Sequence, residues 1–201
     1  MPTLRRDAVE NRAALLDAAR VCLNQDPEAS LEVIAAEAGL SRRAVYGHFP
    51  TRDDLLREVT AHGAARIASA VAGTAHPVAL IELALIAGRL WSEVDSIQVM
   101  AVFAVRGSLK SSIADGLAPL RAMVRASVER GQADGTIRTD IAADRLARLV
   151  EDSLLSVFDE STRSDLPHAD GHRLTMLSVL GTLGLSWREA SALIDSTKEL
   201  L

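Results

Sequence analysis

The chain has 201 residues, of which 48% are hydrophobic and 24% are charged, and its formal net charge at pH 7 is −5. This length and apolar content allow one domain, or two closely packed ones, with a sizeable core, and they exclude intrinsic disorder. The single cysteine, Cys22, excludes an internal disulfide. The many Ala, Leu and Arg residues, with few aromatic residues and only six prolines, favour helices over strands, so we expect an all-α fold.

Membrane and export signals are missing from the sequence. No hydrophobic stretch approaches the ~18 residues needed to cross a membrane. The first residues, MPTLRRDAVENR, lack the apolar core of a signal peptide. We therefore expect a cytoplasmic protein without a membrane partner.

The first predicted helix covers residues 7–24, where apolar side chains repeat on one face. Asp7 can cap its amino end, and Asp26 and Pro27 end it. Arg5 and Arg6 precede this helix, and they suit either a basic arm or a short disordered tail.

Two short helices and a tight turn are predicted next. Helical spacing of apolar residues predicts a helix over residues 30–38, with Ser30 as its N-cap. Gly39 can adopt the left-handed conformation that ends this helix. Ser41 can then cap a second helix over residues 42–49, which Pro50 ends. This arrangement is a helix-turn-helix unit.

The second of these helices carries hydrogen-bond donors and an apolar anchor. Val45 and Phe49 lie four residues apart and can hold the helix against the protein. The donors, which can reach phosphates or base edges, are Arg42, Arg43, Tyr46 and His48. An ordinary helical hairpin with a solvated arginine face fits the same local features. The net charge does not decide between them, because attraction to phosphate depends on charges near the contact surface.

A longer pattern favours DNA binding. Gly39-Leu40-Ser41, Val45-Tyr46-Gly47-His48-Phe49-Pro50, Arg52 and Leu55-Leu56 together closely resemble the DNA-binding domain of the tetracycline-repressor (TetR) family, over residues 8–56. The resemblance implies that Tyr46, His48 and Arg52 hold phosphates, while Arg42 and Arg43 reach guanine edges. The residues expected to bind double-stranded operator DNA are Ser30, Ser41, Arg42, Arg43, Tyr46, Gly47, His48 and Arg52.

Two positions depart from the usual family pattern. Arg43 stands where a small residue is common, and Gly47 stands where a bulkier one is common. Glycine inside a helix costs about 1 kcal/mol relative to alanine, so Gly47 suits a close approach of the backbone to DNA. These departures affect the operator sequence rather than the mode of binding.

The rest of the chain reads as a series of helices. Thr51 and Asp54 form a capping pair for a helix that reaches residue 72, and Ser186 and Glu189 form a capping box for the last helix. Between them we expect a helix that has Pro77 in its first turn and ends near Trp91. Four further helices are predicted over residues 97–105, 119–130, 141–158 and 172–183. Gly131 closes the helix at 119–130, and residues 161–171 form a loop.

Signals for other chemistry are weak. The chain has no Gly-rich phosphate loop, nucleophile turn or metal-binding helix motif, so we expect no catalytic residues, no metal and no cofactor. His168 and His172 are four residues apart, but Asp170 and Gly171 between them indicate a loop, so a metal site is disfavoured there. The family resemblance implies a small-molecule pocket among the middle helices, and the candidate lining residues are Trp91, Met100, Phe103 and Arg106. Core packing is the alternative role for each of them.

The last long helices suggest how the chain assembles. The helices at 141–158 and 172–183 are apolar on two faces, and one of those faces suits a partner chain. The resemblance implies a homodimer formed by a four-helix bundle, which matches two half-sites about one DNA turn apart. The candidate interface residues are Leu149, Leu154, Met176 and Leu177.

These predictions combine into one interpretation. Residues 1–52 form a three-helix DNA-binding domain, and a fourth helix joins it to a helical ligand-binding and dimerisation domain at residues 53–201. We interpret the protein as a transcriptional repressor that a small-molecule effector releases from a palindromic operator. The alternatives are a helical enzyme without a recognisable catalytic motif, and a regulator that is ligand-independent or activating.

Overall fold

The computed structural model describes residues 3–94, 110–164 and 166–201, and the regular elements in these ranges are all helices. The predicted all-α fold is confirmed. Contacts between residues divide the chain into two units. The first contains the amino-terminal helices up to Ala65, together with a segment that ends at Gly116, and the second contains the remaining residues from Arg66 onward.

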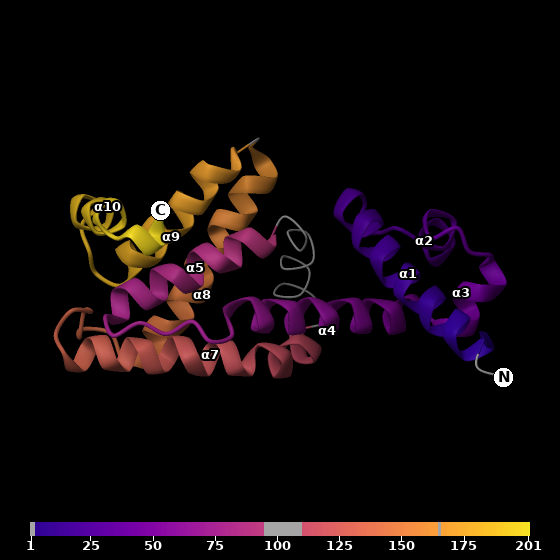
Figure 1. The fold of residues 1–201 in the computed structure, drawn as a ribbon, viewed down its shortest axis with the longest axis horizontal. Coiled ribbons are helices and arrows are strands. Elements are labelled where there is room, and N and C mark those ends of the chain that lie inside the picture. Colours follow the sequence, from indigo (N-terminus) through magenta and orange to yellow (C-terminus); the bar gives the residue numbers. More distant parts are fainter. Residues whose placement is uncertain (1–2, 95–109, 165) are drawn as a thin grey trace. The chain divides into compact units, whose positions relative to one another are not determined.

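The first unit is built on α1 (Thr3–Gln25), α2 (Leu31–Glu37), α3 (Arg42–His48) and the beginning of α4 (Arg52–Val71). Helix α2 packs against both α1 and α3 (Figure 1). The largest fully buried side chains here are Leu15, Ile34, Phe49 and Leu55. The predicted helices at residues 30–38 and 42–49 are confirmed to within one residue at each end, with Ser30 and Ala38 as the caps of α2.

The start of the first helix was predicted wrongly. Helix α1 begins at Thr3, so Asp7 lies inside it and does not cap it. Leu4, Arg5 and Arg6 are good helix formers, and no Gly or Pro separates them from Asp7, so nothing stops the helix from extending toward the amino terminus. The capping pair of α4 is confirmed: the Thr51 amide donates to Asp54 at 3.1 Å, and the Asp54 amide donates to Thr51 Oγ1 at 3.2 Å.

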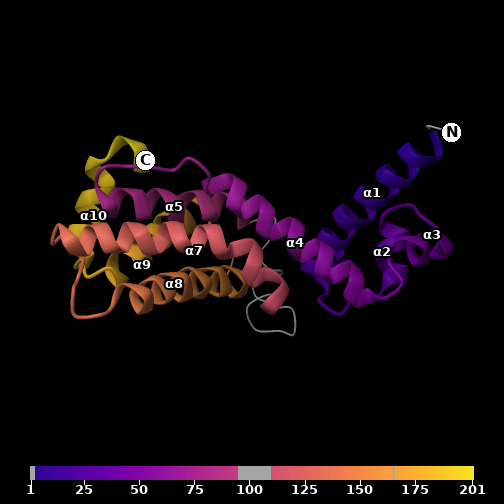
Figure 2. The same cartoon turned by 90° about the horizontal axis from the view of Figure 1, so that it is seen from below.

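The second unit contains the rest of α4 and the later helices. These are α5 (Ala79–Val94), most of α7 (Lys110–Ala133), α8 (Ala143–Arg163), α9 (His168–Thr182), α10 (Trp187–Ser196) and a short 3-10 helix, η1 (Lys198–Leu200). Helix α9 packs against α5, α8 and α10 (Figure 1). Helix α7 runs alongside α5 and α8 (Figure 2), where its Ser127 bonds to Glu82 and its Arg121 bonds to Glu151.

Three helix boundaries in the second unit differ from the prediction because of proline and glycine. Pro77 precedes α5, which begins at Ala79, so it is not in the first turn. Pro119 lies inside α7; it is exposed, so water can reach the carbonyl that its missing N–H leaves unpaired. Gly131 does not end α7, since a Cβ there would collide with Ile137 and the glycine makes room for that side chain. The left-handed residue beyond the helix is Gly135, with φ of +79°.

The predicted loop at residues 161–171 is also wrong, because most of it is helical. Helix α8 continues to Arg163 and α9 begins at His168, so His168 and His172 share one helix. Gly171 is buried, and a Cβ on it would collide with the ring of Trp91. This glycine therefore serves close packing of α9 on α5 and not chain flexibility. The Ser186–Glu189 capping box is confirmed. The helix predicted at residues 97–105 lies outside the described residues.

Candidate nucleic-acid interface

Helices α2 and α3 are joined by a turn that their capping residues define. Ser30 Oγ accepts the Val33 amide at 3.3 Å, and Ser41 Oγ accepts the Ala44 amide at 3.2 Å. Gly39 has φ of +67°, the left-handed conformation predicted for it, and the Leu40 amide donates to Ala35 at 2.8 Å. The turn thus satisfies the backbone groups at both helix ends and fixes the course of the chain between α2 and α3.

Helix α3 has one buried face and one exposed face. Val45 is fully buried, and Phe49, at the C-cap, is buried with it. Arg42, Arg43 and Tyr46 are exposed on the other side. Gly47 is also exposed and nothing lies within 4 Å of where its Cβ would be, while His48 is half-buried. The helix therefore presents two guanidinium groups and a phenol to solvent from a rigidly held backbone.

An acidic residue of α2 contacts this exposed face. Tyr46 donates its hydroxyl to Glu32 at 2.9 Å, and the Arg42 guanidinium lies 3.3 Å from the same carboxylate. Arg43 forms no hydrogen bond or ion pair with the residues that the structure describes. The two adjacent arginines therefore differ: Arg42 is paired within the protein, and Arg43 is open to a partner.

Arg52 fastens the loop before α2. Its Nε donates to the Ala29 carbonyl at 3.0 Å, and Nη2 donates to the Pro27 carbonyl. The side chain is half-buried by these contacts. Arg52 thus positions the beginning of α2, in addition to any phosphate contact that its remaining N–H groups make.

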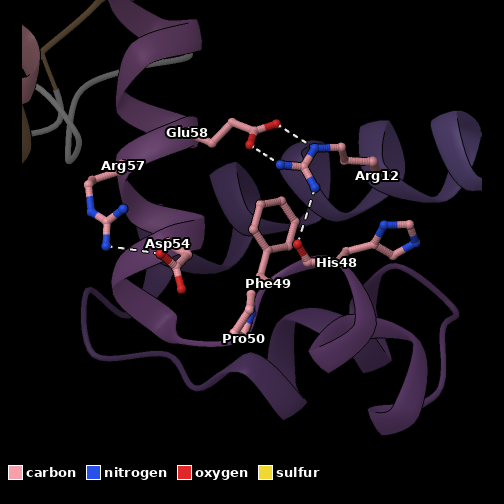
Figure 3. A pocket seen from close by; sticks show the side chains of 7 residues that line it. All are labelled: Arg12, His48, Phe49, Pro50, Asp54, Arg57 and Glu58. Carbon is pink, nitrogen blue, oxygen red and sulfur yellow. Dashed lines mark hydrogen bonds and ion pairs between the residues drawn. The ribbon is translucent and has the colours of Figure 1, made fainter.

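The close-up in Figure 3 shows how α1 and α4 hold the end of α3. Arg12 pairs with Glu58 through two hydrogen bonds, one of them 2.8 Å from Nε to Oε1, and donates to the His48 carbonyl at 3.2 Å. Its guanidinium also lies 4.5 Å from the centroid of the Phe49 ring. Together with Pro50, Asp54 and Arg57, these residues line a shallow pocket (Figure 3).

Sequence reasoning missed Arg12 and Glu58. They are 46 positions apart, and neither belongs to a recognisable local pattern. The arrangement satisfies a carbonyl in the last turn of α3, which no residue within that helix can do. Its role is to position the helix that carries the exposed arginines.

The candidate pocket residues are only partly described. Trp91 is buried in α5, where it stacks on Phe158 with 5.8 Å between ring centroids. Its Nε1 lies 3.1 Å from His168 Nδ1 and 2.9 Å from the His168 carbonyl. Burial lowers the pKa of the neighbouring His172 below its ordinary value, and the nearby His168 adds to this effect. Met100, Phe103 and Arg106 lie outside the described residues.

The four candidate interface residues differ in exposure. Leu149 is 39% exposed and Leu177 is half-buried, so both offer apolar surface. Leu154 and Met176 are buried in the core of the single chain. Leu174 adds another exposed apolar side chain on α9. None of the described helices is long and apolar enough to cross a membrane.

The geometry defines a class of protein: an all-helical chain whose amino-terminal unit carries a helix-turn-helix with an arginine-bearing second helix. Residues 15–59 match the family model for bacterial regulatory proteins of the tetR family. This match covers the helix-turn-helix and parts of α1 and α4 on either side of it.

One curated relative is similar to part of the chain. The chain is 44% identical over 62 residues to the HTH-type transcriptional repressor LfrR of Mycolicibacterium smegmatis; the match covers 30% of this chain and 33% of that protein. The chain thus spans about a third of the length of this curated relative.

Similar folds extend over most of the chain. The TetR-like regulator LfrR from Mycobacterium smegmatis, solved with proflavine, has a TM-score of 0.65 at 19% identity and covers 88% of this chain and 98% of its own. The fatty acid degradation regulator FadR from Bacillus halodurans has a TM-score of 0.71 at 16% identity, with 86% and 94% covered. At these identities the likeness shows a shared fold.

Proposed function

We propose that this protein is a DNA-binding transcriptional regulator, a cytoplasmic homodimeric repressor that a small-molecule effector releases from a palindromic operator. In this proposal residues 1–52 read the DNA, and residues 53–201 bind the effector and form the dimer. The observation that carries it is α3, which is anchored by Val45 and Phe49 and exposes Arg42, Arg43 and Tyr46. An exposed helix of this kind fits the major groove.

The relatives support the same proposal. The curated relative, 44% identical over 62 residues, is a transcriptional repressor. Proteins of similar fold were solved with proflavine, with stearoyl-CoA and with resorcinol, which supports a small-molecule effector for this chain too. We place its site in the second unit. Within that unit we keep Trp91, Met100, Phe103 and Arg106 as the candidate lining. An effector releases the DNA only if it binds the DNA-free arrangement of the dimer more tightly than the DNA-bound one.

Roles on the DNA follow from the exposed groups. Tyr46, His48 and Arg52 are proposed to hold phosphates, with Ser30, Ser41 and Gly47 at the same surface, and Arg42 and Arg43 to read guanine edges. Arg43 is the better test of base reading, because its removal breaks no contact among the described residues. Arg43→Ala should cost ~1–3 kcal/mol on the specific site and less on random DNA.

The experiment measures binding of the purified protein to labelled duplexes over a range of salt concentrations. The proposal expects log affinity to fall with log salt, with a slope near −0.9 for each neutralised phosphate. Arg43→Ala should then reduce the preference for the selected site without unfolding the protein. Affinity that does not change with salt would contradict DNA binding.

The dimer is tested by a charge on the proposed interface. Leu149→Glu should give a folded monomer with weaker operator binding, since a buried charge without a partner opposes association and each half-site must then bind separately. Val78→Glu is the matched control, because Val78 is also 39% exposed but lies outside α8 and α9. Sedimentation reports the mass. A wild-type protein that is monomeric at micromolar concentration yet binds its operator tightly would refute the dimer.

A further inference from the structure

Three side chains from α2 and α3 form a closed polar cluster on the exposed face of the helix-turn-helix. Glu32 accepts the Tyr46 hydroxyl at 2.9 Å and lies 3.3 Å from Arg42 Nη2. The Arg42 guanidinium carbon lies 5.6 Å from the centroid of the Tyr46 ring, so these two groups also contact each other. We call Glu32, Arg42 and Tyr46 the Glu32 cluster.

The carboxylate of this cluster is ionised at neutral pH. The hydrogen bond from Tyr46 is the largest cause that holds the pKa of Glu32 below its ordinary value, and the charge of Arg42 acts in the same direction. A negative charge thus sits among groups proposed to meet a negatively charged ligand. The negative charge of Glu32 repels DNA phosphates and therefore weakens their binding at this surface.

We propose that Glu32 is a specificity-determining residue: it holds Arg42 in an ion pair that a guanine edge replaces better than a single non-specific phosphate does. This inference rests on the proposed DNA-binding function. It assigns to one acidic residue of α2 a part in discriminating among DNA sequences.

Random DNA and a specific site offer different hydrogen-bond acceptors to Arg42. Non-specific binding comes from phosphate neutralisation and counterion release, and an arginine already paired with a carboxylate contributes less to it. Guanine presents two acceptors, O6 and N7, that an arginine can bind at once. The specific site therefore replaces the contact that Arg42 loses on leaving Glu32, whereas a single phosphate replaces it less well. Glu32 weakens both modes of binding but weakens the non-specific mode more, and the ratio of the two affinities rises.

A purely structural role makes a different prediction. If Glu32 only ties α2 to α3, its loss should loosen α3 and weaken binding to every DNA. Glu32→Gln separates the two roles, because glutamine keeps an oxygen that can accept the Tyr46 hydroxyl but carries no charge. The specificity role predicts tighter binding to random DNA, which loosening of α3 does not produce.

The experiment uses fluorescence anisotropy with the full-length protein and two labelled duplexes, one of random sequence and one selected by the wild-type protein from a random pool. Glu32→Gln should bind the random duplex about two- to fivefold more tightly, the range expected when one exposed ion pair is removed. Its affinity for the selected duplex should change less. Its salt slope on random DNA should steepen by about 0.9 for each phosphate that Arg42 newly neutralises.

Two controls isolate the cluster. Glu37→Gln removes the same charge from the opposite end of α2, where the side chain is exposed, and should reproduce neither the tighter binding nor the steeper slope. In an Arg42→Ala background the effect of Glu32→Gln on random DNA should largely disappear, because the double-mutant cycle then removes the group through which Glu32 acts. Thermal melting checks that each variant is folded.

The possible results separate the two hypotheses. Equal binding of Glu32→Gln and wild type to random DNA at all salt concentrations would overturn the specificity role, and so would weaker binding to both duplexes. If Glu37→Gln has the same effect, the tighter binding comes from the net charge of the protein and not from the Glu32 cluster, and the specificity role is wrong. If the wild-type protein binds neither duplex in a salt-dependent way, the proposed function itself fails and the inference fails with it.

Discussion

Polar side chains stabilise the helix-turn-helix region and the carboxy-terminal helices in different ways. In the first region, arginines at the surface reach carbonyls of distant turns: Arg12 bonds to His48, and Arg52 bonds to Ala29. Both side chains stay partly exposed, so water can replace part of what a substitution removes.

In the second unit, Glu82 and Trp91 are enclosed. Glu82 is 4% exposed and accepts hydrogen bonds from Ser127, from Arg130 and from the His76 amide. Trp91 lies against Gly171 with no space for a further carbon atom. Substitutions at these buried positions should therefore lower the free energy of unfolding more than changes on the exposed face of α3.

Gly171→Ala should have the largest effect on stability. The added methyl group collides with the buried Trp91 ring, which is hydrogen-bonded and cannot move freely, so we expect a loss of about 3 kcal/mol. Urea unfolding followed by tryptophan fluorescence measures it, because both tryptophans, Trp91 and Trp187, lie in the second unit. A loss below about 0.5 kcal/mol, the size of an ordinary surface change, would contradict the tight packing described here.

Glu82→Gln should cost about 1–3 kcal/mol at pH 7, because a buried carboxylate that accepts three hydrogen bonds is replaced by an amide that also carries donors. Burial alone would raise the pKa of Glu82, but the hydrogen bonds from Ser127, the His76 amide and Arg130 outweigh it and lower the pKa below its ordinary value. A lowered folded-state pKa gives stability that is present above the ordinary glutamate pKa of 4.5 and is lost as the pH falls through the folded value.

The pH dependence supplies the control for Glu82. Wild type should lose stability below pH 4.5 more steeply than Glu82→Gln, as measured by urea unfolding at several pH values. Glu129→Gln, an exposed change on α7, should leave the pH dependence of wild type nearly unaltered. Identical pH profiles for wild type and Glu82→Gln would show that protonation of Glu82 does not cause the loss of stability at low pH.

Arg12→Ala should cost about 1–2 kcal/mol, less than the buried changes, because the ion pair with Glu58 is partly exposed. The variant also leaves the His48 carbonyl without its donor, so DNA affinity should fall more than that of Arg20→Ala, an exposed-pair control on the same helix. Circular dichroism melting and anisotropy measure the two effects. If neither the stability nor the DNA affinity changes, Arg12 does not position α3.

Gly47→Ala should have the smallest effect on stability and the opposite sign. Nothing lies within 4 Å of the added Cβ, and alanine favours a helix by up to about 1 kcal/mol over glycine. DNA affinity should nevertheless fall, since the methyl group stands on the face proposed to approach the DNA. A variant that is more stable and binds DNA as tightly as wild type would show that this glycine is not needed for close approach.

The sequence predicts the helix-turn-helix well because its determinants are local. Ser30, Gly39 and Ser41 each act on backbone groups within a few residues, so their spacing alone predicts two helices and a turn. The same holds for the capping box at Ser186 and Glu189. Contacts that depend on folding were not predictable in this way, and the bond between Arg12 and Glu58 joins residues 46 positions apart.

Glycine and proline account for most of the wrong boundaries. Gly131 was predicted to end a helix and Gly171 to lie in a loop, but both lie inside helices, because a neighbouring side chain occupies the space of a Cβ. The residue type does not distinguish a backbone that turns from a backbone that is closely approached. The contact of Glu32 with α3 was likewise hidden, since a glutamate in the first turn of a helix is ordinary.

The measurement that tests the central claim most directly is selection of DNA by the purified protein from a pool of random duplexes, followed by sequencing. We predict enrichment of a two-fold symmetric site with half-sites one helical turn, ~34 Å, or a multiple apart. Arg43→Ala should lose the preference at one position in each half-site. Recovery of no common sequence from the wild-type protein, with binding that does not weaken as salt rises, would contradict the claim that α3 reads DNA.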